Sequence, residues 1–398
     1  MGSETHLRLV YMPLSGVNTS KPVRKLVKTP WLVVQTCDAI HAHVDSCVPK
    51  EKKRILLIVN PKSGKGDGGA LIEEHCMPVL HAAHAQVDTY VTNAPHHATT
   101  IIQGADVSQY DAIISAGGDG TFHEILQGML RRDDWKLCVD TLSLVQAPCG
   151  SGNALAASLG IWDVATAAYV AIRGRTSKID VATILQPSTN RIMFSFLSVT
   201  FGLIANLDIG TEHLRWMGGN RFVWGALKEI FSQRVYPCHV TYIDGDECMQ
   251  KTSTRHVYKG PPLHFLGSLV SDDGICIDQV HGIDDSWQQL SGDFQLFSMS
   301  NLPWLDMNFN LHPHARMSGG TYNFLYCLGK QGIMKSLKLM TESEKGMHMH
   351  LVEERHISAF RIDPIAENTW LVIDGEAIER APVYGEVHPK LLSVMCPP

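Results

Sequence analysis

The chain has 398 residues, of which 44% are hydrophobic and 19% are charged, and its formal net charge is −6. This composition predicts a globular protein of two or three domains and gives no sign of nucleic-acid binding. No secretory signal and no apolar stretch of the ~18 residues that a membrane span needs can be found. The ten cysteines include no C-x-x-C pair, which favours reduced thiols in the cytosol.

Residues 1–53 are predicted to form a partly ordered N-terminal extension. Trp31 to Gln35 has the composition of a strand, and basic residues gather at Lys21 to Lys28 and at Lys50 to Arg54. We interpret these basic clusters as solvated surface, with an electrostatic membrane contact as the alternative.

Between residues 54 and 178, strand, loop and helix signals alternate, which predicts an α/β domain with a parallel sheet. Four apolar runs are typical of its strands: Arg54 to Asn60, Val87 to Thr92, Tyr110 to Ala116 and Leu142 to Ala147. Helical periodicity follows at 70–85, 96–103 and 122–131. Because ligands of such sheets bind beyond the carboxyl ends of the strands, the loops that follow them are expected to form one site.

Residues 179–398 are predicted to form a second domain, antiparallel, β-rich and sandwich-like. Its expected strands are Ile179 to Leu185, Ile192 to Gly202, Cys238 to Ile243, Phe294 to Met299, Tyr322 to Leu328, Ile357 to Ile362 and Trp370 to Ile373. Helices are expected at 221–231 and 334–340, and residues 244–290 are interpreted as a possible insertion.

Three glycine-rich loops carry the chemical signal. They are Asn60-Pro-Lys-Ser-Gly-Lys-Gly66, Gly117-Gly-Asp-Gly-Thr121 and Pro148-Cys-Gly-Ser-Gly-Asn153. Glycine lets the backbone approach phosphate oxygens, and a helix that begins at such a loop favours anions. Asp119 is a carboxylate among these glycines and cannot attract phosphate. It is therefore predicted to be a base or a metal ligand at a phosphoryl-transfer site.

In this order, the three loops resemble the diacylglycerol kinase and sphingosine kinase superfamily, and 150–159 is similar to sphingosine kinases in particular. Gly-Gly-Asp-Gly also resembles phosphofructokinases and NAD kinases. The resemblance implies an α/β domain of that type, and transfer of the γ-phosphoryl group of ATP, with Mg²⁺, to the primary hydroxyl of sphingosine or a related sphingoid base. A diacylglycerol or ceramide kinase and a catalytically silent nucleotide-binding module are the alternatives.

The resemblance also implies roles for single residues, with Asp119 as the general base. The implied nucleotide-site positions are Asn60, Pro61, Lys62, Thr92, Asn93, Ala94, Pro95, His96, Gly117, Gly118, Gly120, Glu124, Gly150, Ser151, Gly152, Arg215, Arg221, Asp374, Gly375 and Glu376. Taken alone, the two arginines are also explained by a solvated helical face, and Asp374-Gly375 by a hairpin turn.

Asp208 matches the substrate-binding aspartate of the family. A carboxylate there favours a cationic amino lipid over a neutral one. The alternative is a helix N-cap, since Asp208 precedes Ile209. Peripheral contact with a membrane surface is expected because the substrate partitions into bilayers. No protein metal site is predicted: the pairs His312/His314 and His348/His350 are interpreted as packing or surface residues, and His123 as structural.

Overall fold

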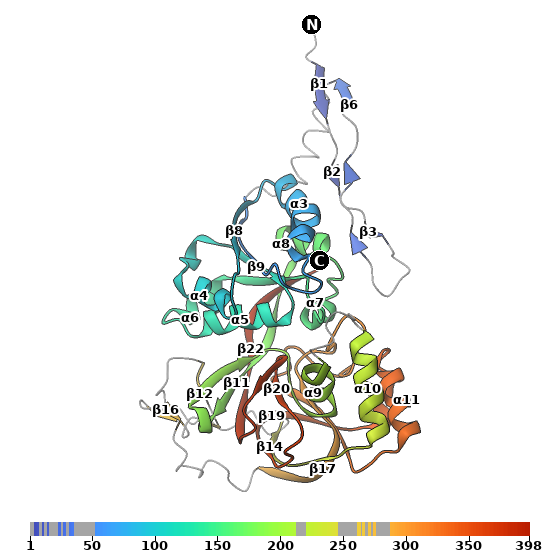
Figure 1. The fold of residues 1–398 in the computed structure, drawn as a ribbon. Coiled ribbons are helices and arrows are strands. Elements are labelled where there is room, and N and C mark those ends of the chain that lie inside the picture. The colour runs from blue at the N-terminus through green and yellow to red at the C-terminus, as the bar shows by residue number, and fades with distance from the viewer. Residues whose placement is uncertain are drawn as a thin grey trace.

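The computed structural model describes residues 52–211, 220–245 and 287–398, short pieces at 261–263, 265–266, 270–271 and 274–275, and paired strands of the N-terminal extension. These strands are β1 (Glu4–Leu7), β2 (Val10–Tyr11), β3 (Leu14–Ser15), β4 (Val23–Arg24), β5 (Val27–Lys28) and β6 (Leu32–Gln35). They form three antiparallel pairs, β1 with β6, β2 with β5 and β3 with β4. The β1–β6 pair projects farthest from the rest of the molecule, whereas β4 contacts the helix at 164–173 (Figure 1). The strand expected near Trp31 is thus β6.

The α/β domain is built on a parallel sheet in the order β10-β9-β7-β8, which confirms its prediction. The strands are β7 (Arg54–Val59), β8 (Gln86–Val91), β9 (Ala112–Gly117) and β10 (Ser143–Pro148). β9 is buried over its whole length, because helices cover both faces of the sheet, whereas the edge strand β8 is largely exposed. All four strands run in one direction, so their carboxyl ends lie at the same edge.

The helices of this domain are α2 (Gly68–Leu71), the π-helix η1 (Ile72–Cys76), α3 (Met77–Ala82), α4 (His97–Gly104), the short 3₁₀ helix η2 (Val107–Gln109), α5 (Asp119–Leu130), α6 (Trp135–Thr141), α7 (Ala154–Ser158) and α8 (Val164–Arg173). The three helices predicted from periodicity are confirmed, the glycine-rich turn at 148–153 leads into a helix, α7, as expected, and the sequence patterns missed α6 and α8. Helix α5 begins at Asp119, because Gly118 is extended and leaves the helix free to start directly after it. The inner face of α5 is fully buried through Phe122, Ile125 and Met129.

The second domain is β-rich and antiparallel, as predicted. Its elements are β11 (Arg175–Gln186), η3 (Pro187–Thr189), β12 (Arg191–Ser195), β13 (Ser198–Gly202), α9 (Leu203–Asp208), α10 (Asn220–Ser232), β14 (Tyr236–Asp244), β15 (Val270–Ser271), β16 (Gly274–Ile275), β17 (Gln288–Ser300), β18 (Tyr322–Leu328), α11 (Ile333–Ser343), η8 (His348–Leu351), β19 (Glu353–Pro364), β20 (Leu371–Ile373), β21 (Glu376–Ile378) and β22 (Val383–Cys396). Within the described ranges, no helix combines the length and the hydropathy needed to cross a bilayer.

Two long strands give this domain its sandwich-like form. β17 pairs with β14 up to Phe294 and with β18 beyond it, and β19 changes from β18 to β14 at Ile357. Strands that pass from one layer to the other in this way form the corners of a β-sandwich. Its core is rich in aromatic rings, among them Phe297, Phe324 and Phe360.

The last strand, β22, joins the two domains. It pairs along β11 and, through Val394 and Leu144, continues into the parallel sheet at β10. Leu392 and Val394 lie in the same hydrophobic core as the helices of the α/β domain. Strand β22 therefore adds to the sheet and the core of the first domain. The domain boundary at 178/179 stays a prediction. The insertion at 244–290 also stays a prediction, and most of that segment lies outside the described residues.

Candidate active site

The predicted site loops come together where the parallel strands end. Residues 60–66 follow β7, 92–96 follow β8, Gly118 follows β9 and 149–153 follow β10. In-register pairing aligns the ends of the three neighbouring strands: Val59 lies opposite Ala116, and Gly117 lies opposite Pro148. In the described structure, one edge of the sheet thus carries all three glycine-rich loops.

Glycine is required here because the loops touch each other. A Cβ atom built on Gly150 would lie 2.3 Å from Cα of Gly118. One built on Gly64, which has φ +60°, would lie 2.5 Å from the carbonyl oxygen of Cys149. No side chain fits at these distances. The glycines therefore serve the packing of loop against loop in addition to any approach to phosphate.

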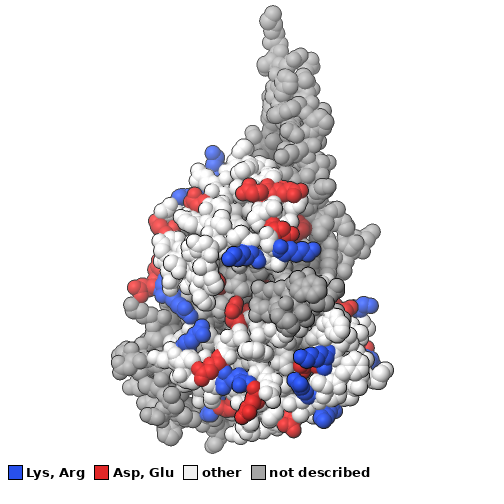
Figure 2. Space-filling view, viewed as in Figure 1, with Lys and Arg blue, Asp and Glu red and all other residues white. Residues whose placement is uncertain are grey.

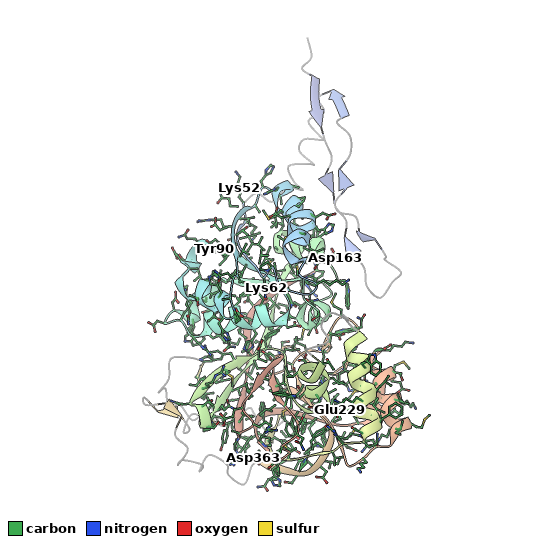
Figure 3. All side chains as sticks on the ribbon, in the orientation of Figure 1. Lys52, Lys62, Tyr90, Asp163, Glu229 and Asp363 are labelled. Carbon is green, nitrogen blue, oxygen red and sulfur yellow. The ribbon has the colours of Figure 1, made fainter. Side chains whose placement is uncertain are left out.

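Asn60 fastens the first loop to helix α5. Its Nδ2 donates to Oγ1 of Thr121 at 3.1 Å, and its Oδ1 accepts from the amide of Lys62 at 3.1 Å. Pro61 is half-buried, whereas the side chain of Lys62 is exposed on the α/β domain (Figure 3). The side-chain amide of Asn60 thus supports the loop, while the side chain of Lys62 lies exposed on it.

Glu124 connects helix α5 to the loop after β8. Its carboxylate accepts from the amide of His96 at 2.9 Å and from the amide of Ala98 at 3.0 Å. His96 has φ +61°, and it precedes the first residue of α4. Thr92 is buried, whereas Asn93, Ala94, Pro95 and His96 are exposed. Glu124 thus satisfies the free amides at the start of α4 and fixes the shape of this loop.

Asp119 is held by groups from the third loop and from β10. Its Oδ1 accepts from Nε2 of Gln146 at 3.1 Å and from the amide of Leu155 at 3.4 Å, and its Oδ2 accepts from the amide of Ala154 at 3.0 Å. Burial raises the pKa of Asp119, against the effect of these three hydrogen bonds, and the charge of Asp374 raises it further. The carboxylate is therefore oriented and has an increased proton affinity.

Asp374 and Gly375 form the turn of the β20–β21 hairpin, with φ +51° and +85°. The Asp374 side chain is buried and accepts from the amides of residues 196–198 and from Oγ of Ser195. Glu376 is exposed, and a Cβ built on Gly120 would lie 3.4 Å from its Oε1. The hairpin interpretation is confirmed, and Glu376 is the residue of this motif that faces the start of α5.

Asp208 is the last residue of α9, so the N-cap interpretation was wrong. Its side chain is half-buried, and a Cβ built on Gly375 would lie 3.6 Å from its Oδ2. The carboxylate thus lies beside the same hairpin whose next residue, Glu376, lies over Gly120. Asp208 and the start of α5 adjoin one hairpin, although they are far apart in sequence.

Of the remaining predicted site residues, Gly117, Ser151 and Gly152 are described, whereas the side chains of Arg215 and Arg221 are not. Gly117 packs against Thr121 and Ser151 is exposed, whereas a Cβ built on Gly152 would lie 2.9 Å from Oδ2 of Asp119. Arg215 lies outside the described residues, and the side chain of Arg221 does too, although its backbone is in the first turn of α10. Among the described residues, no three His, Cys, Asp or Glu side chains form a group able to hold a metal.

The sequence patterns missed Gln146 and Ser195. Both are fully buried polar residues, and they contact Asp119 and Asp374, respectively. Gln146 stands in an otherwise apolar strand, which is the one signal that could have drawn attention to it. Ser195 gave no signal, because its partner is 179 residues away.

Comparisons with known proteins show which family the chain belongs to. A family model described as the diacylglycerol kinase catalytic domain matches residues 54–184. Sphingosine kinase 1 of Arabidopsis thaliana is 31% identical over 82% of this chain and 67% of its own length. Sphingosine kinase 1 of Homo sapiens is 27% identical over 84% of this chain and 89% of its own length.

Among solved structures, a diacylglycerol kinase from Bacillus anthracis has the same fold, with a TM-score of 0.61 and 18% identity, over 88% of this chain and 99% of its own. The fold class expected from the three loops is thereby confirmed. Identity to the plant enzyme over most of both chains decides the family. This chain belongs to the sphingosine kinase family and is an ATP-dependent lipid kinase with a diacylglycerol kinase catalytic domain.

Proposed function

We propose that the protein transfers the γ-phosphoryl group of ATP to the primary hydroxyl of sphingosine or a related long-chain sphingoid base. The observation that carries this proposal is the position of Asp208 beside Gly375, in the hairpin whose Glu376 lies over Gly120. An amino lipid whose ammonium pairs with Asp208 would present its headgroup toward the start of α5. A neutral lipid offers no positive charge to that half-buried carboxylate, so an amino lipid is the better match.

Asp119 is proposed as the general base for this hydroxyl. Its raised pKa brings its proton affinity closer to that of the hydroxyl it must deprotonate in the transition state. Gln146 and the amides at the start of α7 fix the direction of the carboxylate. The exposed Lys62 and the backbone of the three loops would bind the phosphates.

Mg²⁺ fits the oxygen donors of this site. Magnesium is commonly held by nucleotide phosphates together with one or two carboxylates, and the exposed Glu376 over Gly120 is a carboxylate in that position. When bound, the ion would neutralise charge on the phosphates.

The enzyme is further proposed to reach its substrate at an anionic membrane surface through α10 and α11. Trp224 and Phe231, seven residues apart on α10, are each 63% exposed, and Met334 on α11 is 79% exposed. The amide of Gly332, just before α11, donates to Gln233, just after α10, so the two helices adjoin.

Exposed Lys228, Lys335 and Lys338 flank these apolar side chains, and basic residues are visible on this side of the molecule (Figure 2). Large apolar groups among lysines suit the interface of an anionic bilayer. Replacing Trp224 and Phe231 with serine should reduce co-sedimentation with vesicles of phosphatidylserine and phosphatidylcholine. Tyr90→Ser, on the distant strand β8 (Figure 3), is the matched control and should bind as the parent protein does; equal binding by all variants would exclude this surface.

The proposed reaction is tested with the full chain, radiolabelled ATP and a panel of sphingosine, diacylglycerol and ceramide. We expect sphingosine to be the preferred substrate. Asp208→Asn should lower kcat/KM for sphingosine by about 10- to 100-fold, since a charge-assisted hydrogen bond contributes ~1.5–3 kcal/mol. The control is Asp140→Asn, at an exposed position of α6. Preference for a neutral lipid, or equal loss on every lipid, would contradict the proposal.

A further inference from the structure

Helix α5 contacts the second domain through polar side chains at a four-residue spacing. His123, Gln127 and Arg131 stand at i, i+4 and i+8, and therefore share one face of the helix. Nε2 of Gln127 donates to the carbonyl of Phe194 at 2.6 Å, and its Oε1 accepts from the amide of the same residue at 3.1 Å. Arg131 donates to the carbonyl of Ile192 at 3.1 Å. This polar face fixes α5 against β12.

His123 lies at the end of this face nearest to the site. Its Nδ1 is 3.0 Å from Oδ2 of Asp374. Because an ionised carboxylate can only accept, Nδ1 carries the proton and donates it. Asp374 is 1% exposed, and its other donors, residues 195–198, belong to its own domain. His123 is thus the contact through which α5 holds the hairpin turn.

The hairpin turn at Asp374 and Gly375 lies next to other residues of the site, so its position matters to them. Gly375 adjoins Asp208, and Glu376 lies over Gly120, beside Asp119. His123 is one helical turn from Asp119 on the same face of α5. A shift of the turn relative to α5 would therefore move Glu376 and the neighbour of Asp208 together.

We propose that His123 is a positioning residue: through its hydrogen bond to Asp374 it fixes the position of Glu376 over Gly120, at the start of α5. This inference rests on the proposed function for the role of Glu376 in ATP binding. The inference assigns no chemical step to His123. It also implies that Asp374 does not contact the nucleotide, because both oxygens of its carboxylate already accept hydrogen bonds from protein groups.

Asparagine and glutamine provide a matched pair of substitutions. The amide nitrogen of Asn reaches about as far as Nδ1 of histidine, whereas that of Gln reaches about as far as Nε2. His123→Asn can thus keep the hydrogen bond to Asp374, and His123→Gln cannot. Arg131→Gln, two turns further along the same face, is a control for general weakening of the contact between the domains.

The experiment measures binding of a fluorescent ATP analogue without lipid, with the melting temperature of each variant. His123→Gln should weaken binding about fivefold, His123→Asn and Arg131→Gln less than twofold. In a Glu376→Gln background, the His123→Gln effect should disappear, because both changes remove the same contact with the nucleotide.

Equal weakening by Asn and Gln, or an effect that persists in the Glu376→Gln background, would overturn the inference. Since no lipid is present, this outcome is separate from the proposed reaction. A protein that shows the expected pattern of ATP binding but phosphorylates no sphingoid base would contradict the proposed function alone.

Discussion

Gln146 donates from Nε2 to Oδ1 of Asp119 at 3.1 Å, and its own Oε1 accepts from the amide of Ala156 at 2.7 Å. Gln146 is completely buried inside β10. The glutamine therefore connects the carboxylate of one glycine loop with the helix that follows another. Both ends of its amide are used, so its orientation is fixed and fixes that of Asp119.

Gln146→Leu should lower kcat and reduce stability together. The substitution leaves the buried amide of Ala156 unpaired, which costs about 1–3 kcal/mol. It also removes a hydrogen bond that lowers the pKa of Asp119, so the acid limb of the rate profile should move to higher pH. Urea unfolding and the dependence of kcat on pH check the two effects. An unshifted acid limb would show that Gln146 serves the fold alone.

Asp119 should produce that acid limb in the parent enzyme. A general base works ionised, and burial raises the pKa of Asp119 above the usual carboxyl value of ~3.9. The rate should thus rise with pH through a limb above the ordinary carboxyl range. Asp119→Asn should reduce kcat by roughly 10²–10⁴-fold and abolish the limb. If a variant with low activity keeps the same limb, Asp119 has only its structural role at the start of α7.

Gly150→Ala tests the contact between the glycine loops. The new methyl group would collide with the backbone of Gly118, so the two loops must separate. ATP affinity should fall about tenfold or more, since overpacking costs ~1–3 kcal/mol. Gly104→Ala, at the end of α4, meets no atom within 4 Å and should leave ATP affinity unchanged. Similar behaviour of the two variants would show that the loops do not need their close approach.

Local signals predicted most of the fold. Unbroken apolar runs such as Ile55 to Val59 identify buried parallel strands regardless of their partners, and glycine clusters mark the turns after them. β22 was missed because Pro389 and Lys390, the latter with φ +54°, interrupt its pattern. The amide of Lys390 donates to the buried Asp180, a partner 210 residues away that the local sequence cannot reveal.

The difference between local signals and contacts distant in sequence also explains which parts of the site could be predicted. Asp119 stands out because a carboxylate among glycines is unusual, and this signal lies within the five consecutive residues 117–121. The hydrogen bonds of Asp374 join residues 176–251 positions apart, so its buried role could not be separated from a nucleotide contact. Polar residues that support a site depend on tertiary pairing, which local sequence patterns do not record.

Asp180 should make stability fall as pH rises between about 4 and 6. It is fully buried, and burial raises its pKa to about 6, against the hydrogen bonds from the amides of Lys390 and Gly320. In this window the folded state holds a proton that the unfolded state, with a pKa of ~3.9, has lost. The free energy of unfolding of the parent protein, minus that of Asp180→Asn, should thus fall by up to about 3 kcal/mol as pH rises through this window. A constant difference would contradict the raised pKa.

His312 should have the opposite effect. Its Nδ1 donates to Oδ1 of Asn323 and its Nε2 accepts from Ser298, which holds the buried ring in its neutral form. Burial lowers its pKa to about 3, so below pH ~6.5 the unfolded state binds a proton that the folded state does not. The contribution of His312 is therefore complete above pH ~6.5 and is lost at about 1.4 kcal/mol per unit as pH falls toward 3. Denaturant unfolding of the parent protein and of His312→Gln, compared at each pH from about 7 to about 4.5, isolates this effect from that of Asp180, which both proteins keep. The variant should be the less stable at pH 7, and the gap should close on acidification; a gap that widens would mean that the ring is charged in the folded protein.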